Sequence, residues 1–203
     1  MVDWRKVVIR NADCIAGAVE CLDAGSPRED VEKSKARLIY HTAFGSLDQA
    51  LADGTRLIET ERRSKNSAGL LRALRWLSVP LRRTNDIDGA VSALTEAYER
   101  AASLGLRGEM WNAAFYLEGV ALDCENLDLA LEWAPVVVSL DPHATVNGLR
   151  GSDHYYTQAR IEFMRTDYAL ARHYLDLSRD LKRTTPASRG EQSILALDVL
   201  LRV

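Results

Sequence analysis

The chain has 203 residues, of which 47% are hydrophobic and 27% charged, and its 29 acidic side chains slightly outnumber its 26 basic ones. This composition is typical of a globular protein and excludes an intrinsically disordered one. The net charge of −3 disfavours a general nucleic-acid binder, which needs an excess of lysine and arginine. The sequence has no apolar run of the roughly 18 residues that span a membrane, and its three cysteines lack paired spacing, so we expect a cytoplasmic protein.

The predicted elements begin with a helix over residues 4–23, within an N-terminal capping segment of residues 1–25. A second helix is expected to begin at Ser26 and Pro27, because serine caps a helix N-terminus and proline suits its first turn.

Four short segments then repeat one pattern, in which a polar residue is followed by an apolar residue and, four positions after the polar one, by an alanine. The polar residues are Ser46, Asp86, Asn126 and Asp167, and the alanines are Ala50, Ala90, Ala130 and Ala171, so the spacings are 40, 40 and 41. All four polar residues can accept a hydrogen bond from a free N–H at a helix start. Each segment therefore predicts a tight turn, a new helix, and a small residue where two helices approach closely.

Amphipathic segments lie on both sides of each turn, so each unit of about 40 residues is predicted to be a pair of antiparallel helices. Because neither helix can bury its apolar stripe alone, neighbouring pairs must stack, and residues 1–203 are expected to form one helical-repeat domain. The predicted pairs cover residues 28–65, 66–105, 107–142 and 152–183, and a C-terminal helix follows over 186–203. That last helix either caps the fold or continues into a longer protein.

Two prolines and one segment interrupt the helical patterns. Pro80 and Pro135 lie inside apolar helical stretches, where a missing N–H donor predicts a kink or a break. Residues 141–153 contain Gly148 and Gly151 and are predicted to form the longest loop.

The sequence has no recognisable catalytic or metal-binding motif. Cys14 and Cys21 share a helical face and are interpreted as small buried residues, while Cys124 has no neighbour that would activate it. A glycine-rich phosphate loop and a nucleophile elbow are both missing. No metal-binding spacing links the four histidines, which are His41, His143, His154 and His173. We therefore expect neither catalysis nor a cofactor.

These repeats resemble the tetratricopeptide-repeat family. The resemblance covers residues 28–203 and includes, besides the capped alanine segments, the aliphatic Leu74, Leu77 and Leu81 and the closing motif Leu140-Asp141-Pro142. It implies an all-α fold, a right-handed superhelical solenoid of antiparallel helix pairs with about ten helices. The unit is longer than the family's repeat of about 34 residues and is similar to the repeat arms of maltose-activator-type bacterial regulators. Glu118 departs from the pattern, because it occupies a site where the family has a small residue.

In the resembled family, the first helix of each pair lines a concave groove. The candidate partner-binding residues that this implies are Lys35, Arg72, Arg75, Arg82, Asn112, Phe115, Tyr156 and Arg160, with Arg83 as an alternative to Arg82. A stripe of arginines favours an acidic or carboxylate-bearing peptide, because the guanidinium binds carboxylates in a bidentate manner. The alternative is a solvated helix face neutralised by acids of the next pair. Ile39 occupies an asparagine site of the family's carboxylate clamp, so that specific function is not supported.

The sequence thus predicts a non-catalytic scaffold that binds a protein or peptide, as a regulatory or sensor arm of a larger signalling or transcription protein. Neither nucleic acid nor a membrane is an expected partner. Two alternatives stay open, namely a sensor of a small molecule or signal peptide, and a free-standing chaperone. A homodimer through the C-terminal helix is also open.

Overall fold

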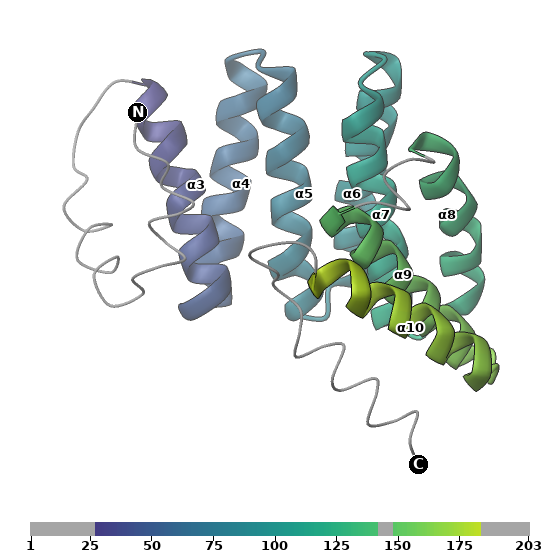
Figure 1. Cartoon of the computed structure of the whole chain (residues 1–203). Helices are drawn as coiled ribbons and strands as arrows, with labels where there is room; N and C mark the ends of the chain where they lie inside the picture. Colours follow the sequence, from purple (N-terminus) through teal and green to yellow (C-terminus); the bar gives the residue numbers. More distant parts are fainter. Residues whose placement is uncertain (1–26, 142–147, 184–203) are drawn as a thin grey trace. The chain divides into compact units, whose positions relative to one another are not determined.

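The computed structural model describes residues 27–141 and 148–183, in which every regular element is an α-helix and no strand occurs (Figure 1). The helices are α3 (Pro27–Phe44), α4 (Leu47–Arg63), α5 (Ser67–Arg83), α6 (Ile87–Ser103), α7 (Arg107–Asp123), α8 (Leu127–Leu140), α9 (Gly148–Met164) and α10 (Tyr168–Arg183). In these ranges, no helix combines the length and hydropathy that crossing a bilayer requires. The helices expected at 4–23 and 186–203 lie outside the described residues, so the total of about ten stays a prediction.

The four predicted N-caps are confirmed. The side chains of Asp86, Asn126 and Asp167 accept hydrogen bonds of 2.9, 3.1 and 3.0 Å from the backbone N–H three residues later. The bond from Gln49 N–H to the hydroxyl of Ser46 is longer, at 3.5 Å. The alanines that follow the four caps are all 0% exposed, as expected of small residues at close helix contacts.

Five corners between helices share one backbone conformation. Each has a residue with positive φ, between 54° and 66°, one position before the residue that precedes the next helix; these are Lys65, Asn85, Gly105, Glu125 and Thr166. At the α4–α5 corner, Lys65 N–H donates to the carbonyl of Arg62 and Asn66 N–H donates to that of Glu61. These two bonds define a Schellman motif, which satisfies carbonyls at the helix end. From Lys65 to Glu125 the corners recur every 20 residues, so over this range the backbone repeats with half the period of the sequence pattern.

The chain divides after Glu109 into two compact units. In the first, α3 packs on α4 and α5, α4 packs on α5, and α5 packs on α6, so these helices lie side by side in sequence order (Figure 1). Its core contains Leu38, Leu57, Leu74 and Leu94, each at most 2% exposed. Gly54 lets α5 approach α4 closely, because a Cβ there would lie 2.7 Å from Cδ1 of Leu77.

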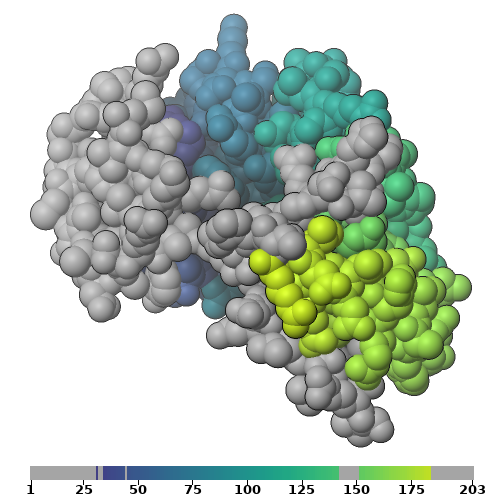
Figure 2. Space-filling model, viewed as in Figure 1, coloured from purple at the N-terminus to yellow at the C-terminus, as the bar shows by residue number. Residues whose placement is uncertain are grey.

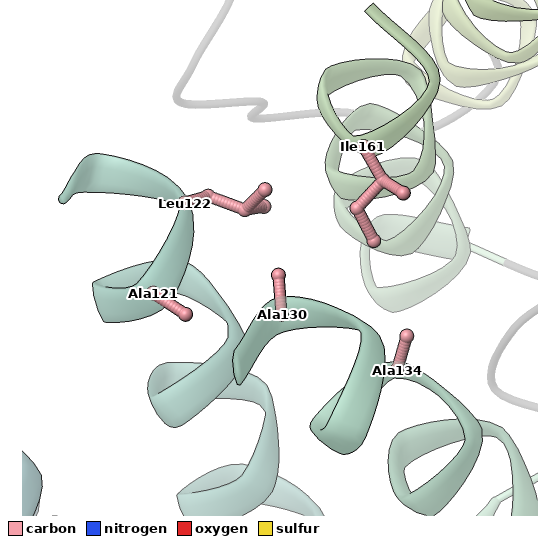
Figure 3. Packing of buried hydrophobic residues seen from close by; sticks show 5 residues of the cluster. All are labelled: Ala121, Leu122, Ala130, Ala134 and Ile161. Carbon is pink, nitrogen blue, oxygen red and sulfur yellow. The ribbon is translucent and has the colours of Figure 1, made fainter. Parts of the chain in front are cut away.

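In the second unit, α8 packs on α9, and α9 packs on α10. Figure 3 shows one core cluster, in which Leu122 of α7, Ala130 and Ala134 of α8, and Ile161 of α9 face a common space. Side chains of α9 and α10 also form a continuous surface in the space-filling view (Figure 2). The hydroxyls of Ser152 and Ser178 cross-link these two helices, each donating to the other's backbone carbonyl at 2.8–2.9 Å.

The structure excludes a break at either proline, leaves the alternative of a kink as a prediction, and shortens one predicted loop. Pro80 does not break its helix, because α5 continues to Arg83, and burial of the proline ring offsets part of the lost hydrogen bond. Pro135 does not break α8 either; it lies on an exposed side, where water can bind the carbonyl left without a donor. The loop predicted over 141–153 is also too long, because α9 already begins at Gly148, four residues before the predicted start of the last pair.

Candidate functional site

The first compact unit holds four of the eight predicted partner-binding residues. Lys35 lies on α3 with its side chain 13% exposed, and its Nζ is 3.9 Å from Oε1 of the buried Glu61. Arg75 lies on α5, and its Nη1 is 2.6 Å from Oε2 of Glu109. Arg82 is half-buried near the end of α5. The ion pair of Arg75 corresponds to the alternative interpretation, in which acids of the next helix pair neutralise the arginine stripe, since Glu109 lies on α7.

Arg72 differs from these residues, because it is exposed and, among the described residues, its Nε donates to the carbonyl of Ala68 in its own helix and to no acid. Arg63 and Lys65 are also exposed, at and just after the end of α4, nine and seven residues before Arg72 in the sequence. Among the described residues, no acid forms an ion pair with any of the three. We call Arg63, Lys65 and Arg72 the basic corner.

The surrounding sequence intensifies the positive charge of the basic corner. Residues 62–85 contain seven arginines and lysines and no acidic residue. Nearby, Glu96 accepts bonds of 2.8 Å from both Arg62 and Arg100, so one carboxylate is shared by two guanidinium groups. Glu96 is therefore already paired with Arg62 and Arg100, and the described residues provide no acid that neutralises the basic corner.

The second compact unit holds the other four predicted residues. Phe115 of α7 stacks on Trp111, with ring centroids 5.1 Å apart and planes inclined by 6°. Arg160 of α9 forms an ion pair of 2.8 Å with Asp123 at the end of α7. Asn112 and Tyr156 are half-buried on the same two helices. Phe115 and Arg160 are thus engaged in contacts within their unit.

A buried polar cluster that the sequence did not predict as a site joins α7 to α9. The side chain of Glu118 is fully buried, and Nε2 of Gln158 donates to its Oε1 at 3.3 Å. Oγ1 of Thr157 lies 3.2 Å from the other oxygen, Oε2. The only sequence signal was the departure at Glu118, an acid at a site where the resembled family has a small residue.

Burial favours the protonated form of Glu118. Thr157 has one hydroxyl hydrogen, and its Oγ1 lies 2.8 Å from the carbonyl oxygen of His154, a partner that can only accept. The hydroxyl can therefore donate to only one of two acceptors at a time, this carbonyl or Oε2 of Glu118. Burial raises the pKa of Glu118 to about 8, although the Thr157 hydrogen bond and the charge of Arg160 both oppose the rise.

Two neighbouring groups on α9 also have shifted pKa values. Burial lowers the pKa of His154 to about 4, and its Nδ1 has no hydrogen-bond partner in the described part of the chain. Burial raises the pKa of Asp153, with Lys182 of α10 opposing the rise from 3.9 Å. Near neutral pH, these pKa values leave Glu118 protonated and His154 neutral.

Metal-ligating side chains do not gather in residues 27–141 and 148–183, where no three histidine, cysteine, aspartate or glutamate residues converge. Cys124 is half-buried at the end of α7. His143, Cys14 and Cys21 lie outside the described residues.

Neither models of known protein families nor curated protein sequences match this chain.

Proposed function

We propose that this chain is a non-catalytic, cytoplasmic binding scaffold of the tetratricopeptide-repeat type, a right-handed superhelix that acts as a regulatory arm of a larger signalling or transcription protein. Its partner is a peptide segment rich in carboxylates, which docks at the basic corner. The observation that carries this proposal is the exposure of Arg63, Lys65 and Arg72 without acidic partners among the described residues.

Electrostatics supports an acidic partner. Like charges in one stretch of sequence repel one another, and carboxylates bound among them reduce this repulsion. Arginine also offers a planar fork that fits a carboxylate in two parallel hydrogen bonds. Arg75 is a weaker candidate than the sequence suggested, because an acidic peptide would have to displace Glu109 from it.

The test is the affinity of a fluorescein-labelled peptide of alternating glutamate and glycine, measured by fluorescence anisotropy. Lys65→Glu combined with Arg72→Glu should weaken binding by at least about tenfold. Glutamate is compatible with the backbone at position 65, because Glu125 occupies the equivalent corner with a φ of 56°. The matched control, Arg165→Glu with Arg183→Glu, makes the same change in net charge at exposed arginines of the second unit.

Binding through the basic corner predicts that the control variant keeps the wild-type affinity. Equal affinities of both double variants would instead assign the binding to net charge alone. Failure of wild type to bind the glutamate peptide at low salt would refute the proposal outright.

A further inference from the structure

The outer face of α8 carries an exposed apolar stripe. Leu131, Pro135 and Val138 are spaced by four and three residues, so they share one side of the helix. Leu131 is 42% exposed and Val138 is 39% exposed, and Pro135 between them is exposed too. We call these three residues the α8 stripe.

In α4 and α6, neighbouring residues cover the positions that are equivalent to the α8 stripe. A shift of 40 residues relates Leu131 to Val91 of α6, and a shift of 80 relates it to Leu51 of α4; both are half-buried. Val138 corresponds in the same way to Tyr98, which is half-buried, and to Ile58, which is 6% exposed. Helices α4 and α6 thus have apolar residues with neighbours at these positions, whereas the described residues leave the same positions of α8 open.

Acidic side chains border the α8 stripe. Glu125, Asp128 and Glu132 are all exposed, and none forms an ion pair with a described residue. The sequence offers them little local neutralisation, because residues 108–149 contain seven acidic residues and no lysine or arginine. The face therefore combines apolar area with uncompensated negative charge.

We propose that the α8 stripe and its three acids form a docking surface for a basic amphipathic helix of a partner protein. Such a helix covers the apolar stripe with its own apolar side, as helices do in groove-type peptide recognition, and places lysines or arginines against the flanking acids. Charge complementarity selects this occupant over an acidic or neutral helix. The surface is separate from the basic corner, and its ligand has the opposite charge, so failure of one proposal leaves the other intact.

The probe is a fluorescein-labelled amphipathic helix of lysine and leucine, with a glutamate–leucine helix of equal length as the comparison. Wild type should bind the lysine helix and not the glutamate helix. Two variants should each weaken binding by about tenfold or more, Leu131→Ser with Val138→Ser, and Asp128→Lys with Glu132→Lys. Because all four side chains are exposed, the helical circular dichroism should stay unchanged.

The matched control is Asp88→Lys with Glu99→Lys on α6, which makes the same charge change at two exposed positions. Asp88 is the repeat equivalent of Asp128, so the control also reproduces the loss of an acid from a first helical turn. Its affinity should equal that of wild type. Equal loss in the control, or equal binding of the two probe helices, would overturn the proposal.

Sedimentation distinguishes the partner helix from another possible occupant of the α8 stripe. A second copy of this chain predicts a wild-type dimer that Leu131→Ser with Val138→Ser converts to a monomer. This result would overturn the proposal of a basic partner helix, which predicts the same oligomeric state for wild type and variant.

Discussion

Replacing Glu118 by glutamine should abolish a loss of stability that the wild-type chain suffers as the pH rises above 6.5. Glutamate ordinarily titrates near 4.5, whereas burial raises the pKa of Glu118 in the folded chain to about 8. Between these values the folded chain holds a proton that the unfolded chain has released, so stability falls with pH. The contribution of Glu118 is fully present below pH 4.5 and lost as the pH rises to about 8.

His154 has the opposite dependence, and the two effects cancel over part of the range. Its pKa falls from 6.5 to about 4 on folding, so its contribution is fully present above pH 6.5 and lost as the pH falls to about 4. Between pH 4.5 and 6.5 the two slopes oppose each other. Of these two groups only Glu118 acts between pH 6.5 and 8, and its contribution to the free energy of unfolding should fall by about 2 kcal/mol, at about 1.4 kcal/mol per pH unit.

Glutamine at position 118 preserves both hydrogen bonds without a titrating proton. Its amide oxygen can accept from Gln158, and its amide nitrogen can donate to Thr157. The assay is urea unfolding followed by circular dichroism at pH 6.5 and pH 8 and constant ionic strength. Other titrating groups cancel in the difference between wild type and Glu118→Gln, and Glu132→Gln on the exposed face of α8 is the control. A difference that is equal at the two pH values would mean that the buried carboxyl group is already ionised at pH 6.5.

Three further predictions concern stability and are measured by the same urea titrations. Thr166→Gly should stabilise the chain by about 1 kcal/mol, because a β-branched residue with a φ of 64° is strained. Gly105→Ala, at a φ of 66°, should destabilise the chain by a similar amount. Changes of the same sign in both variants would contradict this account. Asn126→Ala should lower the free energy of unfolding by about 1 kcal/mol and Ser46→Ala by less, because the capping hydrogen bond of Ser46 is longer. An equal loss at both sites would show that the length of the capping hydrogen bond does not affect stability. Leu117→Ala should cost about 2–5 kcal/mol, because its side chain is 0% exposed, and a cost below 1 kcal/mol would show that the site collapses readily.

Helix starts could be predicted from the sequence where a side chain makes the cap. Asp86, Asn126 and Asp167 indicate where the next helix begins, because their side-chain oxygens accept hydrogen bonds from free N–H groups of its first turn. The corner before α7 has no such residue, since Leu106 precedes that helix and the turn depends on backbone bonds at Gly105. Asn66 does cap α5, but Leu70 rather than an alanine lies four positions after it. The sequence pattern therefore marked only every second corner, and the repeat of 20 residues was hidden.

The candidate sites were less predictable, because charge and protonation depend on distant partners. The spacing of Arg72 and Arg75 placed them on one stripe, yet only the structure shows that Arg75 forms an ion pair with Glu109, 34 residues further on. Similarly, Glu118 could be recognised as an unusual acid on an apolar face. Its protonation follows from burial against α9, whose Thr157 and Gln158 lie about 40 residues away, and no local pattern connects them to it.

At the α4–α5, α5–α6, α7–α8 and α9–α10 corners, a single residue both closes the helix behind it and caps the helix ahead of it. Asp86 is an example, because its N–H donates to the carbonyl of Leu81 while its carboxylate accepts from Gly89. Inserting one amino acid there would separate these two tasks, and about 100° of helix rotation per residue would turn the apolar side of the following helix away from its neighbours. Tags or reporter domains inserted into this protein should therefore be tolerated between α8 and α9, where more residues connect the helices, and rejected at the short corners.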